Sequence, residues 1–183
     1  MHTTNNFLSR SFFEQPTIDV AKNLLGKILV CNNKRGIITE TEAYIGFDDP
    51  ACHAAKGRTK RNTPMFKMAG YSYVYMIYGM YYCLNIVTEI EHFPAAVLIR
   101  GVYYNGKNID GPGKLCREFK IDKSLNDIDL INNNTLSFMN NNLVVDIENK
   151  TRVGIKHGTD KLWRFLIKQN CIESLEKRGM AVL

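Results

Sequence analysis

The segment from Ile38 to Tyr44 places the strongest constraint on how this chain folds. It reads Ile-Thr-Glu-Thr-Glu-Ala-Tyr, a pattern typical of a β-strand. Because successive side chains of a strand point to opposite faces of a sheet, we expect Glu40, Glu42 and Tyr44 on one face. Two carboxylates beside an aromatic ring indicate a site for chemistry, but the periodicity does not decide which carboxylate would act as a base.

Two compositional features follow this strand. Residues 56–67 contain basic side chains and no Asp or Glu, and residues 71–82 hold six of the nine tyrosines. The basic residues are Lys56, Arg58, Lys60, Arg61 and Lys67. Basic loops bind phosphates and aromatic rings stack on bases, so the order of acid, base and stacking surface is typical of an enzyme that acts on a nucleic-acid base.

Size and charge limit the alternatives. With 183 residues and 45% hydrophobic content the chain can bury one substantial core, and we expect a single domain over residues 1–183. The net charge of +6 favours a polyanionic partner, although many soluble proteins are mildly basic.

Cysteine usage and hydropathy indicate the compartment. The five cysteines are widely spaced and form no C-x-x-C pair, which is typical of a reduced intracellular protein. The chain has no apolar run of about 18 residues and its start lacks the pattern of a signal peptide. We therefore expect a cytoplasmic protein without a membrane partner, associated with the nucleoid if the source is bacterial.

The first half of the chain predicts a helix, a hairpin and a loop. A short helix begins at Thr17 as N-cap and stops at Gly26. Residues 27–31 and 35–45 form a hairpin with a turn at 32–34, followed by a loop over 46–60 and a helical turn within 61–68.

The second half predicts mostly strands. Residues 71–77 and 81–88 form a hairpin whose tip, Tyr78-Gly79-Met80, exposes Tyr78 and Met80. The other expected elements are a strand over 95–103, a helix introduced by Gly111-Pro112-Gly113, and strands near 143–147, 153–156 and 162–167. The Asn-rich 132–142 segment is left without regular structure.

Several motifs taken together resemble the alkyladenine-type 3-methyladenine DNA glycosylase family. They occur in order from about Ser11 to Ile167: Glu40-Thr41-Glu42-Ala43-Tyr44, His53-Ala54, Arg58-Thr59, Arg61-Asn62, Tyr73-Val74-Tyr75, Tyr78-Gly79-Met80, Cys83, Asn85, Val97-Leu98-Ile99-Arg100, Gly111-Pro112-Gly113-Lys114-Leu115-Cys116, Arg152-Val153-Gly154-Ile155 and Trp163-Arg164-Phe165. Three departures are Cys52, where a small polar residue is usual, and Ala69 and Leu162, where prolines are common. We expect these three departures to affect the rigidity of the loops and the range of substrates.

The resemblance implies a fold and an activity. The fold is α+β: a single domain with a curved, mostly antiparallel sheet, an open barrel-like core and short flanking helices. The activity is removal of damaged purines from double-stranded DNA by hydrolysis of the N-glycosidic bond, with no metal or organic cofactor. The implied lesions are 3-methyladenine and 7-methylguanine, together with hypoxanthine or ethenoadenine, and the protein is expected to act as a monomer with no obligate protein partner.

The resemblance also assigns roles to residues. Glu42 is the general base, and Arg100 helps to hold the attacking water. Tyr44, His53 and Tyr75 line the base pocket, Asn85 excludes undamaged guanine, and Tyr78, with Met80 beside it, fills the vacated base stack. The predicted contacts to the DNA backbone are Arg58, Lys60, Arg61 and Lys114.

Elementary chemistry agrees with these roles and leaves alternatives open. A carboxylate can deprotonate water and stabilise an oxocarbenium-like transition state, and an aromatic cage favours a cationic purine. Glu40 remains a rival base, and Gly111 to Lys114 reads equally as a plain turn. Several of the tyrosines Tyr71, Tyr73, Tyr81 and Tyr82 are expected to be structural. Cys52, His53 and the two glutamates lack metal-ligand spacing. The alternative function is a noncatalytic nucleic-acid-binding module, in which the two glutamates would repel the ligand.

Overall fold

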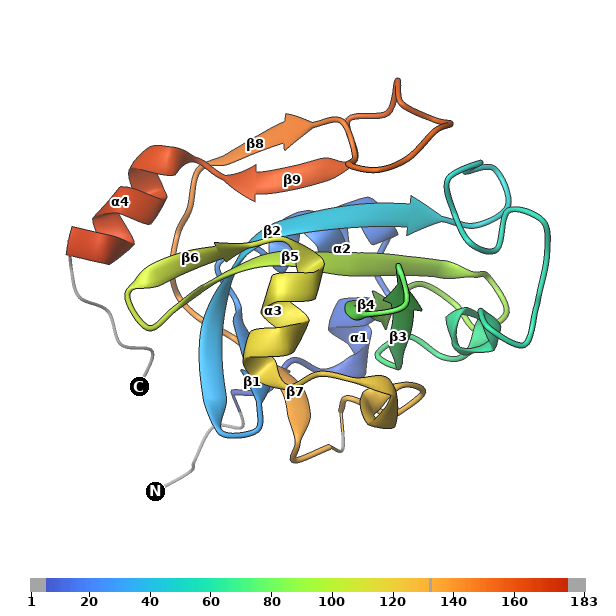
Figure 1. Cartoon of the computed structure of the whole chain (residues 1–183), viewed down its shortest axis with the longest axis horizontal. Helices are drawn as coiled ribbons and strands as arrows, with labels where there is room; N and C mark the ends of the chain where they lie inside the picture. The colour runs from blue at the N-terminus through green and yellow to red at the C-terminus, as the bar shows by residue number, and fades with distance from the viewer. Residues whose placement is uncertain (1–5, 132, 178–183) are drawn as a thin grey trace.

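A curled antiparallel sheet organises the molecule (Figure 1). The computed structural model describes residues 6–131 and 133–177. The main strand order is β3-β4-β5-β2-β1-β7; in addition β6 pairs with β5, β9 with β2 and β8 with β9. The strands and helices together make an α+β fold with an open, barrel-like sheet, as expected. Among the described residues, none of the helices has the length and apolarity to span a bilayer.

The predicted first hairpin is confirmed, with a shorter turn. Strands β1 (Ile28–Cys31) and β2 (Lys34–Ile45) are joined by Asn32 and Asn33, whose φ values are 49° and 65°. Two central residues with positive φ define the tight turn that matches the twist of paired strands, and Asn tolerates this conformation. Lys34, predicted in the turn, is therefore the first residue of β2.

The predicted helix is α2 (Thr17–Asn23), and the expected cap is wrong. Thr17 lies inside the helix, with Pro16 at the N-cap position. The Thr17 hydroxyl contacts Thr88 and Glu89 instead of capping its own helix. Gly26 follows the helix with φ of 81°, as the predicted stop requires. The helix packs on the sheet, where the Thr41 hydroxyl donates to the carbonyl of Ala21 over 2.8 Å.

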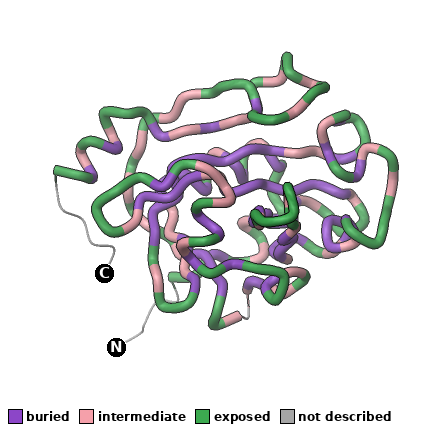
Figure 2. The backbone as a smooth tube through the Cα atoms, in the orientation of Figure 1, coloured by how far each residue is buried: buried purple, intermediate pink, exposed green. Residues whose placement is uncertain are grey.

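The aromatic hairpin is also confirmed. Strands β3 (Ser72–Ile77) and β4 (Tyr81–Val87) pair along their length, and both Tyr78 and Gly79 have positive φ at the tip. Tyr78 is 85% exposed and Met80 67% exposed. This tip stands free of the sheet, as the exposed end of the hairpin in Figure 2 shows.

A register irregularity between β2 and β5 (Ala95–Tyr104) shapes the middle of the sheet. Glu40 pairs with Gly101 and Thr41 with Ile99, so the register steps past Arg100. A Cβ atom on Gly101 would lie 2.7 Å from the Thr39 hydroxyl and 3.0 Å from Glu40 Cβ, which explains why glycine stands here. The bulge brings Arg100 beside the carboxylates of β2.

The C-terminal half differs from the prediction in several places. Strands β8 (Ile147–Lys150) and β9 (Arg164–Ile167) form the last hairpin, while residues 153–156 are loop, where Gly154 has φ of 77°. Strand β7 (Leu136–Met139) lies inside the Asn-rich segment, because Leu136 and Phe138 are buried against β1 despite their polar neighbours. Asn132 lies outside the described residues.

The remaining elements surround this sheet. The helix predicted after Gly111 is α3, and the predicted helical turn is η1. The others are short elements that the pattern did not predict. Their bounds are α1 (Arg10–Phe13), η1 (Thr63–Phe66), β6 (Lys107–Asp110), α3 (Pro112–Phe119), η2 (Lys123–Leu125) and α4 (Gln169–Lys177).

Candidate active site

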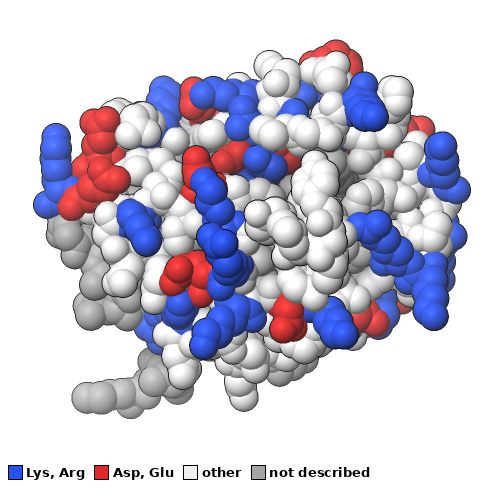
Figure 3. Space-filling view, viewed as in Figure 1, with Lys and Arg blue, Asp and Glu red and all other residues white. Residues whose placement is uncertain are grey.

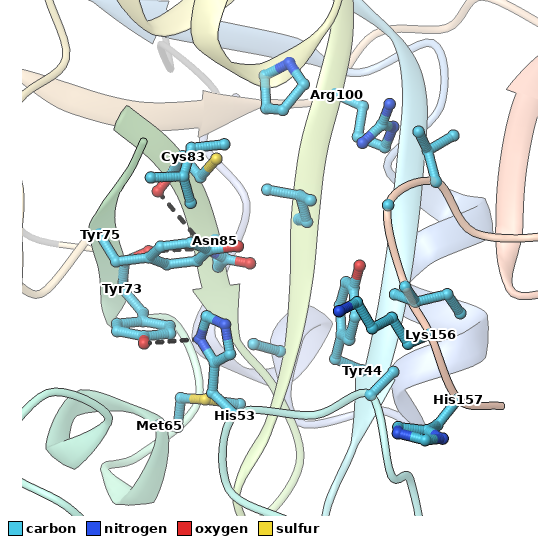
Figure 4. Close-up of a pocket in the computed structure, with 18 of the residues that line it drawn as sticks. Tyr44, His53, Met65, Tyr73, Tyr75, Cys83, Asn85, Arg100, Lys156 and His157 are labelled. Atoms are coloured by element: carbon cyan, nitrogen blue, oxygen red, sulfur yellow. Dashed lines mark hydrogen bonds between the residues drawn. The ribbon is translucent and has the colours of Figure 1, made fainter. Parts of the chain in front are cut away.

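A cavity of about 360 Å³ opens beside β2 and β5. Its wall combines those strands, the β3–β4 hairpin, the loop over residues 46–60 and a second loop over residues 153–157. In Figure 4, Tyr73, Tyr75 and Asn85 lie on one side of it, and Tyr44, Lys156 and His157 lie on the other. The volume falls within the range of sites that enclose a small organic ring system.

Glu42 lies behind this wall, fully buried. One carboxylate oxygen accepts a hydrogen bond from the Tyr44 hydroxyl at 2.8 Å, and the other accepts from the backbone N–H of Val153 at 2.7 Å. The Arg100 guanidinium nitrogen Nε lies 3.4 Å from the second oxygen. Tyr44, Val153 and Arg100 all line the cavity, so every group that holds Glu42 is part of the wall.

The environment of Glu42 has opposing effects on its pKa. Burial raises the pKa, and it outweighs the positive charge of Arg100 and the two hydrogen bonds, which lower it. The net result is a pKa above the ordinary value for Glu. A carboxylate with a raised pKa whose hydrogen-bond partners line a cavity is a candidate general base.

Glu40 shares the face of Glu42 but has different partners. Its carboxylate accepts from Arg100 Nε at 2.9 Å and from Arg164 Nη1 at 3.2 Å. Two arginines thus neutralise Glu40, and of these two partners only Arg100 lines the cavity, whereas all three groups that hold Glu42 line it. The geometry that the strand periodicity predicted is confirmed for both residues, and it favours Glu42 over Glu40 as the group that can act on a molecule in the cavity.

Several aromatic rings contribute to the wall. The His53 ring lies 4.6 Å from the Tyr75 ring, centroid to centroid, and its Nδ1 lies 2.9 Å from the Tyr73 hydroxyl. Partial burial, together with the positive charge of Arg61, lowers the pKa of His53, which favours the neutral ring. Tyr73 is buried in the strand, as expected of a structural tyrosine, and it also orients His53.

Asn85 points into the same side of the cavity from β4. Its side-chain nitrogen donates to the carbonyl oxygen of Tyr73 at 2.9 Å and to that of Cys83 at 3.5 Å. These bonds fix the orientation of the amide. A fixed polar group on an otherwise aromatic wall gives the cavity a means of selecting among bases.

Comparison with known proteins places the chain in a family. The sequence profile of the methylpurine-DNA glycosylase family matches residues 11–171. The chain belongs to the methylpurine-DNA glycosylase family. It is 55% identical over 163 residues to a protein of Rickettsia felis, covering 87% of this chain and 92% of that protein.

Two further relatives give the same result. A Sodalis glossinidius protein is 54% identical over 165 residues, covering 88% of this chain and 97% of its own length. A Wolbachia pipientis protein is 51% identical over 175 residues, covering 94% and 97%. The names of all three relatives give 3-methyladenine DNA glycosylase as an inferred activity.

In this member of the methylpurine-DNA glycosylase family, the residues predicted to contact a DNA backbone differ in the contacts that they make within the protein. Lys60 is exposed, and Arg58 is in contact with the Phe66 ring, with its guanidinium carbon 5.5 Å from the ring centroid. Arg61 donates to the Met76 carbonyl at 2.9 Å and lies over the Tyr75 ring, and Lys114 pairs with Asp110 at 2.8 Å. Arg61 is therefore also part of the support behind the pocket wall. On the face seen in Figure 3, Lys and Arg atoms lie on both sides of an uncharged central patch.

Sequence reasoning missed the second loop of the site. Residues 153–157 line the cavity, and Lys156 and His157 are exposed at its edge. The string Arg152-Val153-Gly154-Ile155 was a family motif without an assigned role. No pattern in the sequence indicates that the Val153 amide reaches a carboxylate 111 residues earlier.

The departures from the family pattern lie away from Glu42. Cys52 is buried in a small cluster that includes Met65, Tyr73 and Ala96, and burial raises the pKa of its thiol to about 11. Ala69 is buried and Leu162 is exposed. Within residues 6–131 and 133–177, no group of three or more His, Cys, Asp or Glu side chains is arranged to hold a metal ion.

Proposed function

We propose that the protein is a DNA repair glycosylase that flips damaged purines out of duplex DNA and hydrolyses the N-glycosidic bond with an activated water. The proposed lesions are 3-methyladenine and 7-methylguanine, together with hypoxanthine or ethenoadenine. One observation carries the proposal: the three groups that hold the buried Glu42 carboxylate all line an aromatic cavity large enough for a purine. Family membership supports the same reaction.

Glu42 acts as the general base in this proposal. Ionised Glu42 accepts a proton from water while positive charge develops on the sugar, and its negative charge stabilises that transition state. Arg100 lines the cavity and its Nε lies 3.4 Å from Glu42, which supports the proposal that its remaining N–H groups hold the water. The raised pKa makes Glu42 a stronger base than an exposed carboxylate.

The aromatic wall selects the base. Tyr44, His53 and Tyr75 offer ring faces to a purine, and an alkylated, cationic purine gains about 0.5–2 kcal/mol from each such contact. The lowered pKa of His53 favours its neutral form, which adds no repulsion toward a cationic lesion. We assign to the fixed Asn85 amide the exclusion of undamaged guanine through its exocyclic amine.

The hairpin tip would replace the flipped base. A base inside a duplex is out of reach of Glu42, and extrusion costs a few kcal/mol of stacking. Tyr78 is exposed at the tip and also borders the cavity, so its ring can enter the stack next to the site, with Met80 beside it. Arg58, Lys60, Arg61 and Lys114 are the proposed contacts to the phosphates.

Water is the proposed nucleophile, so the enzyme would have no lyase activity. Lys156 is the one lysine that lines the cavity among the described residues. Borohydride treatment during the reaction would trap a covalent adduct if this amine attacked the sugar. We expect no adduct, and a trapped adduct that disappears in Lys156→Met would overturn the water mechanism.

Release of free base by the purified protein tests the function itself. The substrates are duplexes with one hypoxanthine or one 7-methylguanine, an undamaged duplex serves as control, and all reactions contain excess chelator. We expect base release from the damaged duplexes alone. Tight binding to damaged duplexes without release from any lesion would favour the noncatalytic binding module instead.

The proposed setting is a cytoplasmic monomer acting on chromosomal DNA without an obligate protein partner. The proposed site consists of one cavity and one basic loop of the same chain, so it requires no second copy of the chain. Sedimentation of the protein at micromolar concentration, alone and with a lesion duplex, should give masses for one protein chain per duplex.

A further inference from the structure

A buried ion pair connects the two loops that form one side of the cavity. Arg152 Nη1 lies 2.5 Å from Asp49 Oδ2, and Arg152 Nη2 lies 2.8 Å from Asp49 Oδ1. Both side chains are 0% exposed. We call this pair the Asp49–Arg152 brace. Burial alone would raise the pKa of Asp49, but hydrogen bonds and charge from Arg152 hold it below its ordinary value, so the carboxylate stays ionised at neutral pH.

The remaining hydrogen bonds of the brace hold the backbone on both sides of Tyr44. Arg152 Nη1 donates to the carbonyl oxygen of Ala43 at 3.0 Å, and Asp49 Oδ2 accepts from the N–H of Ile45 at 3.3 Å. The guanidinium carbon also lies 4.8 Å from the centroid of the Tyr44 ring. Arg152 is not part of the cavity wall whereas Tyr44 is, so the brace supports Tyr44 from behind.

The brace also places the second loop. Val153, the residue after Arg152, donates its backbone N–H to Glu42 at 2.7 Å. On its other side the Arg152 guanidinium lies 5.2 Å from the Trp163 ring, and Nη2 lies 3.4 Å from the carbonyl oxygen of Gly158. These contacts fix both ends of the loop that carries the Val153 amide.

A contribution to the stability of the fold does not by itself explain why the protein contains this buried ion pair. Removing two charges from water is costly, and replacing a buried ion pair by apolar residues of similar size is often neutral or stabilising. In addition, the buried Nε of Arg152 has no hydrogen-bond partner among the described residues, which adds to the cost. The importance of the pair is therefore that it fixes the positions of the neighbouring residues.

We propose that the Asp49–Arg152 brace is a positioning pair of the active site, which holds the Tyr44 hydroxyl and the Val153 amide in place on Glu42. The inference rests on the proposed function, since it concerns the geometry of the proposed base. Neither Asp49 nor Arg152 touches the substrate. They act through the two hydrogen bonds that set the orientation and basicity of the Glu42 carboxylate.

The test replaces both charges at once, because a single substitution would leave a buried charge without its partner. Asp49→Leu combined with Arg152→Met is expected to fold with a melting temperature within a few degrees of wild type. Under single-turnover conditions with saturating protein, we expect base release to slow about 10- to 100-fold. Binding of the lesion duplex should change less than about threefold, because the phosphate contacts and Tyr78 are untouched.

A pH profile separates positioning from general loosening. The Tyr44 and Val153 hydrogen bonds both lower the pKa of Glu42, so losing them should move the acidic limb of the release rate to higher pH. Other groups that face Glu42 stay in the variant and keep their effects. They are Arg100 and its partner Glu40, Arg164 on β9, Tyr75 on β3 and Cys83 on β4. The double variant also removes the positive charge of Arg152, which interacts with Glu42, together with the opposite charge of Asp49 beside it.

Two further variants complete the design. Arg152→Lys keeps a positive charge beside Asp49 but loses the paired geometry, and we expect a smaller loss of rate; this variant serves if the double variant does not fold. The matched control removes the surface pair Lys34–Glu118 with Lys34→Gln and Glu118→Gln, which should leave the rate unchanged.

Each outcome has one meaning. A folded double variant with the wild-type rate and pH profile would overturn the positioning role while leaving the proposed function intact, and so would full activity in Arg152→Lys if the double variant does not fold. Absence of base release by the wild-type protein would instead refute the proposed function on which the inference rests.

Discussion

The inner end of the cavity and the tip of the β3–β4 hairpin are built in opposite ways. Glu42 is fully buried, and three neighbours hold its carboxylate within 3.4 Å. Tyr78 is 85% exposed on a turn that leaves its ring outside the sheet. Proton transfer requires a fixed geometry, whereas insertion into a base stack requires a ring that stands clear of its own protein. In the proposed function, chemistry and DNA insertion therefore belong to separate regions, and we expect that each can be removed without the other.

Removing the Glu42 charge should break the chemistry with the largest effect. Glu42→Gln keeps the size of the side chain. Its amide oxygen can accept from the Val153 N–H, and its amide nitrogen can donate to the Tyr44 hydroxyl oxygen. We expect base release to fall about 10²- to 10⁴-fold, the usual contribution of a general base, with lesion-duplex binding within about threefold of wild type. Single-turnover release and a binding titration measure the two quantities. Release within threefold of wild type would show that Glu42 is not the base.

Truncating the hairpin tip should affect duplex DNA selectively. Stacking of one base on an aromatic ring is worth about 1–3 kcal/mol, so Tyr78→Ala should lower duplex binding and release by about 5- to 100-fold. Tyr78→Phe is the control, since it keeps the ring and should keep most of the activity. A Tyr78→Ala variant with unchanged duplex activity would show that Tyr78 has no role in insertion into the base stack.

The buried charge of Glu42 should also be visible in stability. Its folded pKa is raised above the ordinary 4.5, mainly by burial, so the folded protein holds the proton more tightly than the unfolded chain. This stabilisation is complete below pH 4.5 and is lost as the pH rises through the folded pKa. Glu42→Gln should therefore melt a few degrees above wild type at pH 8, with the difference shrinking toward pH 4. A variant that melts below wild type at pH 8 would contradict this ionisation behaviour.

The smallest expected effect concerns Glu40. Its negative charge raises the pKa of Glu42 and occupies Arg100, so Glu40→Gln lowers the pKa of Glu42. We expect the acidic limb of the release rate to shift to lower pH, and the rate at neutral pH to fall only a few-fold. A loss as large as that of Glu42→Gln would restore Glu40 as the rival base.

The parts of this site that could be predicted from sequence lie within single elements. The period of β2 predicted that Glu40, Glu42 and Tyr44 share a face, and the Tyr-Gly-Met turn predicted an exposed tip, because both depend on backbone geometry over a few residues. Both predictions depend only on residues that are close together in the sequence.

The parts that could not be predicted depend on contacts between distant segments. Asp49 and Arg152 lie 103 residues apart, and no periodicity relates them. The sequence patterns did not indicate that Lys114 pairs with Asp110 at 2.8 Å, and a phosphate contact of Lys114 stays a prediction. Leu136 and Phe138 form a strand because β1 offers them a partner, although the neighbouring asparagines favour a loop.

One measurement compares the two regions directly. Glu42→Gln and Tyr78→Ala are each given the same lesion in duplex and in single-stranded DNA, and base release is followed under single-turnover conditions. The account predicts that Glu42→Gln loses release from both substrates, whereas Tyr78→Ala loses it from the duplex and keeps near wild-type release from the single strand. Equal losses of Tyr78→Ala on both substrates, or retained single-strand activity in Glu42→Gln, would contradict the separation of chemistry from insertion.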